Sequence, residues 1–313
     1  MAAHSPRLNF SGTGLQNSGN FNVGHNLNIG SSNDNCLAAL RLTDPRHDKK
    51  RIESAKGGLL RESYVWILRH GDFQRWRDDR DSRLLWIKGD PGKGKTMLLC
   101  GIIDEIEEQH TDKPHLISFF FCQATNERLN NATGVLRGLI YLLIEQRTEL
   151  KSYVDQRYKH AGKSLFEDVN AWVALSDIFT DIIQHPMLPS VILIIDALDE
   201  CETDLQKLLD LVMRTSSTSH VKWLLSSRNK VDIEKKLRPN QSRTRLSLEL
   251  KDNAEHVSNA VNAYIDHCIS YILGIVDDTD LQTLVRSQLR QKANGTFLWV
   301  RFQNKLLNEK NIA

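Results

Sequence analysis

The stretch that decides the fold reads Gly89-Asp90-Pro91-Gly92-Lys93-Gly94-Lys95-Thr96. It matches G-x-x-x-x-G-K-[ST], the phosphate-binding loop or P-loop. The apolar run 84–87 before it predicts a buried strand, and residues 95–108 after it predict a helix. A strand, a glycine-rich loop and a helix are the context in which this motif binds phosphate. We therefore expect these eight residues to bind a nucleotide; the alternative is a glycine turn with a surface lysine.

The residue types of the loop predict how it holds phosphate. Gly89, Gly92 and Gly94 allow backbone angles that are closed to other residues, so successive N–H groups can point at phosphate oxygens. The positive end of the following helix faces the same anion. We expect Lys95 to bridge the outer phosphates and the Thr96 hydroxyl to hold Mg²⁺.

An acidic element follows the apolar run 191–195, which ends in Asp196. Such a run suits a parallel strand that is buried on both faces. At the end of that strand Asp196 can accept hydrogen bonds from Mg²⁺-bound water, which makes it the second predicted metal residue. Asp199 and Glu200 are candidates to orient the attacking water, and we favour Glu200. Alternatively, both acids only cap a helix expected from about Asp204.

A third element is the strand expected at 221–225, which is followed by Ser226, Ser227 and Arg228. An arginine at this strand end can sense the γ-phosphate and stabilise the charge that builds up during transfer. Because exposed arginines are common, a plain surface role for Arg228 is the alternative.

Together these motifs resemble the NACHT class of STAND NTPases. In that class a small residue follows the Mg²⁺ aspartate and a pair of acids comes soon after, as Ala197 and Asp199-Glu200 do here. Three further stretches are similar to fungal NACHT proteins associated with heterokaryon incompatibility and innate-immunity-like signalling: residues 42–53, 57–60 and 292–300. The resemblance runs from about residue 40 to residue 300.

The resemblance implies a molecular switch. If the resemblance holds, the protein is a closed, ADP-bound monomer that opens when it senses a ligand. It then exchanges ADP for ATP (some members use GTP and GDP) and forms homo-oligomers. Slow hydrolysis serves as a reset. The resemblance also implies that Thr43 and Asp44 contact the base and ribose. Local chemistry supports equally well that either residue caps a helix beginning at Pro45.

Two other functional classes stay open. One is a P-loop catalyst, such as a small-molecule kinase or an AAA-type remodeller, although the sequence shows no clear acceptor lid, basic clamp or trans-acting arginine. The other is a truncated decoy or amyloid seed without turnover. It is motivated by the end of the sequence at Ala313, with no repeat of 20 to 50 residues visible, where a complete receptor would continue into a winged-helix region and a repeat array.

Composition bounds the partners and the compartment. The 313 residues are 40% apolar and 26% charged, which is ordinary for a globular protein, and the net charge of +2 gives no reason to expect a nucleic-acid partner. No apolar run is long enough to span a membrane, and residues 1–10 do not resemble a signal peptide. The five scattered cysteines predict reduced thiols in a cytoplasmic protein.

Residues 9–35 differ from the rest because they consist mainly of Asn, Gly and Ser. Five apolar residues all occupy odd positions and small polar residues fill most even positions between them, as in a strand with one apolar face: Leu15, Phe21, Val23, Leu27 and Ile29. Uncharged segments rich in Asn and Gly are typical of cross-β assemblies, and the tract resembles the amyloid-signalling motifs of fungal NACHT proteins. We expect residues 8–32 to contact an effector protein; the alternative is a disordered polar leader.

The elements predict an α/β fold, with a P-loop NTPase core in which helices flank a parallel five-stranded sheet. We expect a disordered leader at 1–36, a helical lead-in at 37–82 with breaks at Gly57-Gly58 and Gly71-Asp72, the core at 83–250, and a helical C-terminal extension at 251–313. The charged residues 150–170 predict a loop. The resemblance implies that the Leu224 strand separates the P-loop strand from the Asp196 strand. The expected strands are 84–88, 115–122, 191–195, 221–226 and 244–249, and the expected helices from the P-loop onward are 95–108, 132–147, 171–185, 204–214, 231–237, 253–273, 278–292 and 295–308.

Overall fold

The sheet predicted from the sequence forms the centre of the molecule. The computed structural model describes residues 32–108, 115–238, 244–270, 279–297 and 299–300. Its five strands pair in parallel in the order β2-β3-β4-β1-β5. Their bounds are β1 Leu84–Lys88, β2 Leu116–Phe121, β3 Val191–Asp196, β4 Val221–Ser227 and β5 Arg245–Glu249.

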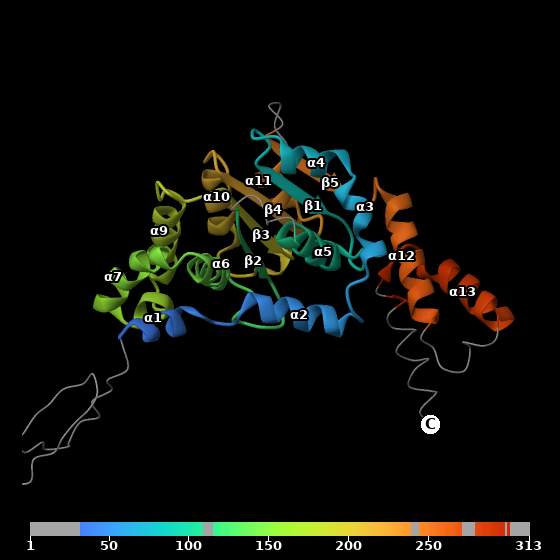
Figure 1. Cartoon of the computed structure of the whole chain (residues 1–313), viewed down its shortest axis with the longest axis horizontal. Helices are drawn as coiled ribbons and strands as arrows, with labels where there is room; N and C mark the ends of the chain where they lie inside the picture. The colour runs from blue at the N-terminus through green and yellow to red at the C-terminus, as the bar shows by residue number, and fades with distance from the viewer. Residues whose placement is uncertain (1–31, 109–114, 239–243, 271–278, 298, 301–313) are drawn as a thin grey trace, which may run out of the picture.

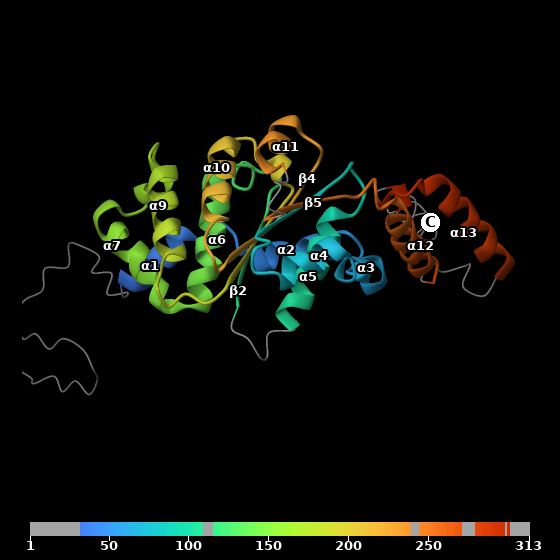
Figure 2. The ribbon, with the colours of Figure 1, turned by 90° about the horizontal axis from the view of Figure 1, so that it is seen from above.

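The central strands are mainly apolar because helices cover both faces of the sheet. Every residue of β2 and β3 is buried, as expected for parallel strands packed on two sides. Helices α6, α10 and α11 lie on one side, and α2, α4 and α5 lie on the other (Figure 2). The helices are α1 Ser32–Leu40, α2 Pro45–Ala55, α3 Val65–Leu68, α4 Gly71–Asp78, α5 Lys95–Glu108, α6 Ala132–Gln146, α7 Lys151–Ala161, α8 Ser164–Glu167, α9 Ala171–Ile183, α10 Leu205–Thr215, α11 Val231–Leu237, α12 Ala254–Ile269 and α13 Thr279–Ala293.

The strand order determines which loops meet. Strand β4 pairs with β1 on one side and with β3 on the other, so the implied separation of the P-loop strand from the Asp196 strand is confirmed. The carboxyl ends of parallel strands share one edge of a sheet, and ligands of open α/β sheets bind outside that edge. The P-loop, Asp196 and the residues after β4 all follow strands at this edge.

The loop expected at 150–170 is wrong, because this segment forms α7 and α8. Val154, Leu165 and Phe166 are buried in the main core, so a few apolar positions suffice to attach two short helices whose other faces carry charge. Gly162 has φ 59° and ends α7, so it separates two helices rather than marking a loop.

Two breaks in the helical lead-in have different outcomes. Gly57 and Gly58 have φ of 89° and 91° and follow the end of α2, which confirms the first break. The second is wrong in its position, because Gly71 and Asp72 form the first turn of α4. The Nδ1 of His70 accepts a hydrogen bond from the Asp72 N–H and thereby caps that helix.

The leader boundary predicted at residue 36 is wrong as well. Helix α1 begins at Ser32, because Cys36 and Leu40 are buried in the main core and hold it there. Residues 1–31 lie outside the described residues, and with them almost all of the tract expected to contact an effector.

The helical extension lies beyond β5 at one end of the molecule, while α1 and α7 lie at the opposite end (Figure 1). Asp266 of α12 pairs with Arg286 and Arg290 of α13 at 2.9 and 2.8 Å, which ties the two helices together. Phe297, Trp299 and Val300 begin the next expected helix, and residues 301–313 lie outside the described part.

Two further expectations concern the cysteines and the membrane. All five cysteines are free and buried, so each packs as a small apolar side chain. In the described ranges, no helix has both the length and the apolar character needed to cross a bilayer.

Candidate nucleotide-binding site

The backbone of the P-loop has the conformation that its glycines predict. Gly92 and Gly94 have φ of 79° and 84°, in the left-handed region that favours glycine. At Gly89 the requirement is also space, since a Cβ there would lie 2.9 Å from the Leu250 Cβ. Helix α5 begins at Lys95 directly after this loop. The loop amides and the helix N-terminus therefore form a positive cradle that suits phosphate.

The ammonium of Lys95 lies over the loop. Its Nζ donates to the carbonyl oxygens of Gly89 and Asp90 at 2.6 and 3.0 Å. Burial lowers the pKa of Lys95, and the negative charges of Asp196 and Asp199 act to raise it. Because its hydrogen-bond partners are backbone carbonyls, this partly desolvated cation can exchange them for a phosphate oxygen.

Asp196 is held by a residue whose role the sequence does not reveal. Its side chain is nearly inaccessible, with the whole residue 2% exposed, and its Oδ1 accepts a hydrogen bond from the Ser226 hydroxyl. The same Ser226 oxygen accepts from the Ala197 N–H at 3.0 Å. Ala197 has φ 52°, a conformation that a non-glycine residue adopts only when its surroundings hold it there. Ser226 thus stabilises the turn that aims Asp196 at the P-loop.

The two acids after this turn have different partners. Asp199 is buried; it accepts from the Arg228 N–H at 2.9 Å and pairs with the Arg228 Nε at 3.3 Å. Glu200 keeps a side chain that is 32% exposed; it accepts from the Ala124 N–H at 3.0 Å and lies 3.9 Å from the Arg228 guanidinium. Helix α10 begins at Leu205, as expected, but the acids accept from the N–H groups of Arg228 and Ala124 and not from α10, so the structure does not support the alternative in which they cap this helix.

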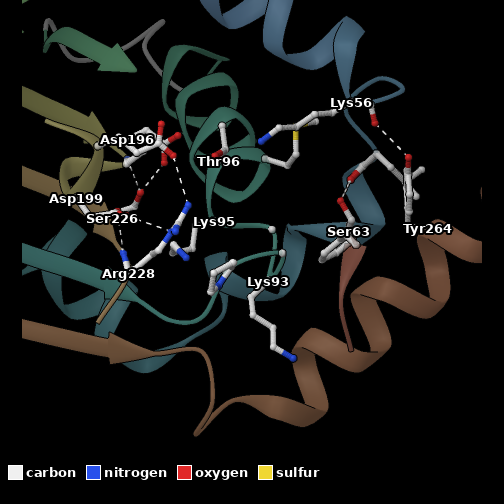
Figure 3. A pocket seen from close by; sticks show the side chains of 18 of the residues that line it. Lys56, Ser63, Lys93, Lys95, Thr96, Asp196, Asp199, Ser226, Arg228 and Tyr264 are labelled. Atoms are coloured by element: carbon white, nitrogen blue, oxygen red, sulfur yellow. Dashed lines mark hydrogen bonds and ion pairs between the residues drawn. The ribbon is translucent and has the colours of Figure 1, made fainter. Parts of the chain in front are cut away.

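These residues surround one cavity of about 350 Å³, a volume in the range of ligand sites (Figure 3). Its walls come from the P-loop, the carboxyl ends of β3 and β4, the segment after α2, and the helical extension. The lining residues are Lys56, Gly58, Leu60, Ser63, Pro91, Gly92, Lys93, Gly94, Lys95, Thr96, Met97, Asp196, Ala197, Asp199, Glu200, Ser226, Arg228, Tyr264 and Phe297.

The sequence interpretation missed one end of this cavity. Lys56, Leu60 and Ser63 come from the segment around Gly57-Gly58, and Tyr264 and Phe297 come from the extension. The only signal was indirect: residues 57–60 and 292–300 are among the stretches on which the resemblance rests. Their convergence depends on tertiary packing, because about 200 residues separate them along the chain.

The extension contacts the P-loop through its backbone. The Phe297 N–H donates to the Gly92 carbonyl at 2.9 Å, and the Lys93 Nζ donates to the Gly295 carbonyl at 3.0 Å. A Cβ at Gly94 would lie 2.7 Å from the Phe297 ring, so this glycine admits the aromatic side chain. These contacts join the P-loop directly to the extension.

Thr43 and Asp44, the other predicted nucleotide contacts, are not among the residues that line the cavity. The Asp44 Oδ1 accepts from the Arg46 N–H at 3.0 Å at the start of α2, so the structure favours the alternative in which Asp44 caps this helix. The hydrogen bond from the Arg46 side chain lowers the pKa of Asp44 and keeps its carboxylate charged. Thr43 keeps a buried hydroxyl for which the described residues offer no hydrogen-bond partner.

The residues expected to hold Mg²⁺ fit a hard divalent cation. Thr96 offers a hydroxyl oxygen and Asp196 a carboxylate oxygen, which are the ligand types that Mg²⁺ prefers, and both line the cavity. Only one Asp196 oxygen is taken by Ser226, so the other is available to the ion or to its bound water.

Comparison with known sequences places this geometry in a family. The family model described as "Nephrocystin 3, N-terminal" matches residues 62–228, more than half of the chain. The chain is 58% identical over 269 residues to "Vegetative incompatibility protein HET-E-1" of Podospora anserina; the match covers 85% of this chain and 20% of that protein. The chain thus spans about one fifth of the length of this curated relative.

Solved structures show only distant likeness. "Structure of C. elegans PCH-2" aligns with TM-score 0.39 and 14% identity over 90% of this chain and 66% of that one. "Structure of Drosophila ORC bound to DNA" aligns with TM-score 0.34 and 15% identity over 97% of this chain and 71% of that one. The P-loop at the edge of a parallel sheet, the family match and the 58% identity agree. The chain belongs to the nephrocystin 3, N-terminal family and is a NACHT-type P-loop protein similar to the fungal incompatibility protein HET-E-1.

Proposed function

We propose that the chain is a nucleotide-dependent signalling switch that binds ATP or GTP with Mg²⁺, hydrolyses it slowly, and acts in incompatibility or innate-immunity-like signalling. The observation that carries the proposal is that Gly92 takes part both in the phosphate cradle and in a backbone hydrogen bond with the extension. This residue belongs to the phosphate cradle, and its carbonyl also accepts the Phe297 N–H of the extension. A nucleotide in the cradle therefore acts on a second structural element, which is what a switch requires.

In the proposed complex the P-loop amides and Lys95 bind the phosphate chain. Thr96 and Asp196 hold Mg²⁺, which supplies positive charge to the phosphate oxygens. Tyr264, Phe297 and Leu60 form the apolar end of the cavity, which suits a base. Thr43 and Asp44 stay a weaker proposal for base and ribose contact, since they would have to act from outside this cavity.

Slow hydrolysis follows from how the acids are bound. Glu200 orients the attacking water, because it is the more accessible acid. Asp199 positions Arg228, which then faces the γ-phosphate. Arg228 and Glu200 must each break contacts within the protein before they can act on the nucleotide, and this favours slow turnover over rapid catalysis.

The nucleotide retained by the folded protein tests the site, its fold and its base preference together. We expect ADP or GDP to co-purify, and turnover to be well below about one per second, the lower limit of ordinary kinases. Faster turnover would favour the P-loop catalyst. Folded protein with no affinity for any purine di- or triphosphate in the presence of Mg²⁺ would overturn the proposal.

The cellular context is proposed on narrower support. Buried free thiols suit a reducing compartment, which favours the cytoplasm. Homo-oligomers on activation and an effector bound through residues 8–32 are further parts of the proposal. A peptide of residues 8–32 should bind Thioflavin T and give cross-β fibre diffraction; a soluble, dye-negative peptide at high concentration argues against templating.

A further inference from the structure

A second cavity, of about 680 Å³, lies at the end of the molecule opposite the extension, among α1, α6 and α7 (Figure 1). Its lining is rich in positive charge. Arg41, Arg128, Arg137 and Lys163 line it, and Glu167 is the one acid among its lining residues in the described chain. The four cations come from four different segments, so tertiary packing alone gathers them.

Arg137 is the buried member of this group and is only 7% exposed. Its Nε and Nη2 donate to the carbonyls of Leu40 and Ala39 at 2.9 and 2.6 Å, which holds the guanidinium in place. Within the described ranges, no carboxylate forms an ion pair with it, and its Nη1 has no hydrogen-bond acceptor. Burial lowers the pKa of Arg137; the charge of Glu167 acts to raise it, and that of Arg128 acts to lower it further. A buried cation with no carboxylate within ion-pair distance is costly, and an anion in the cavity would offset that cost beyond what the more distant Glu167 does.

The other cations are not neutralised locally. Within the part of the chain that the structure describes, the side chains of Arg128 and Lys163 have no hydrogen-bond or ion-pair partner. Arg41 lies 4.0 Å from Asp44, but that carboxylate is already held by Arg46 at 2.8 Å. Positive potential therefore accumulates at the mouth of the cavity, around a buried guanidinium with a free edge.

We propose that this cavity is a second ligand site, separate from the P-loop, which binds a small molecule carrying several phosphate charges. The Nη1 end of the Arg137 guanidinium, for which the described residues provide no acceptor, can donate to a phosphate oxygen, and Arg128 and Lys163 add charge from the rim. The volume lies in the range of small-molecule sites. The preceding residues 1–31 contain no Asp or Glu and so cannot supply the negative charge themselves.

Calorimetric titration of the full chain with inorganic tripolyphosphate tests the proposal. The titrations use the Lys95→Ala background, which removes the P-loop cation, so their outcome does not depend on the proposed nucleotide switch. We expect one saturable site in this background. Adding Arg128→Ala and Lys163→Ala should raise the Kd at least about tenfold, since each removes a charged hydrogen-bond donor. Both side chains are exposed, so folding should be unaffected, as circular dichroism would show.

The control pair Lys159→Ala and Lys235→Ala makes the same change in net charge at exposed positions outside the cavity. We expect it to change the Kd less than about twofold at equal ionic strength. Equal weakening by both pairs, or no saturable binding in the Lys95→Ala background, would overturn the proposal.

The source of the phosphate is separated by two further titrants. An affinity for ATP above that for tripolyphosphate would identify a nucleotide, whereas equal affinity would mean that the phosphate chain alone is recognised. Citrate binding as tightly as tripolyphosphate would overturn the assignment to phosphate.

Discussion

The two ends of the P-loop cavity are built on different principles. At the sheet edge, charged groups follow the carboxyl ends of adjacent strands, and each belongs to a short motif. At the opposite end Leu60, Tyr264 and Phe297 are mainly apolar, and they come from segments that only packing brings together. The difference teaches that the groups proposed to bind phosphate come from local sequence motifs, while the end proposed for the base, and the contact with the extension, depend on the tertiary structure.

The largest expected effect concerns the sheet end. Lys95→Ala removes the cation that lies over the phosphate cradle, and we expect the Kd for Mg-nucleotide to rise about a thousandfold, as for the loss of two charge-assisted hydrogen bonds. Equilibrium titration with a fluorescent nucleotide measures it. Lys235→Ala, an exposed lysine outside the cavity, is the matched control and should bind normally. Unchanged nucleotide affinity in Lys95→Ala would contradict the idea that the sheet end of the cavity binds the phosphates.

Glu200→Gln should separate turnover from binding at the same end. We expect the affinity to be kept and single-turnover hydrolysis to fall about a hundredfold, because the carboxylate proposed to orient the water is lost while the amide keeps an oxygen that can accept from the Ala124 N–H. Asp199→Asn is the comparison variant and should disturb the position of Arg228 as well. Parental hydrolysis in Glu200→Gln would show that another group orients the water.

Ser226→Ala tests the support of Asp196. Removing the hydroxyl leaves the Ala197 N–H and one Asp196 oxygen without a partner, so we expect Mg²⁺-dependent nucleotide affinity to fall about tenfold. Affinity measured with and without Mg²⁺ reports this effect, and Ser226→Thr should restore much of it. An equal loss in both conditions would mean that Ser226 acts on folding alone.

The smallest expected effect is at the apolar end. Phe297→Ala should weaken nucleotide binding about fivefold, since an aromatic contact contributes roughly 0.5–1.5 kcal/mol, and leave tripolyphosphate binding at the P-loop unchanged. Thermal melts with and without nucleotide show whether the extension is still coupled. If Phe297→Ala weakens tripolyphosphate binding as much as nucleotide binding, Phe297 acts on the phosphate cradle. The two ends of the cavity would then not bind the phosphates and the base separately.

Much of the fold was predictable because its helices and strands coincide with strong local sequence patterns. The P-loop helix begins and ends where expected, and the β3 run is apolar because both of its faces are covered. Residues 150–170 were not predictable in the same way. Their charges dominate the local pattern, whereas three buried side chains decide that they form helices.

The sequence by itself determined the residue types of the proposed phosphate site, because the P-loop and the strand that ends at Asp196 are each recognisable from a few consecutive residues. Only the tertiary structure decided that Ser226 holds Asp196, that Asp44 caps a helix outside the cavity, and that Phe297 reaches the P-loop backbone. The same holds for the four cations of the second cavity. Such contacts join residues distant along the chain, and their free energy depends on burial and on partners that no local pattern contains.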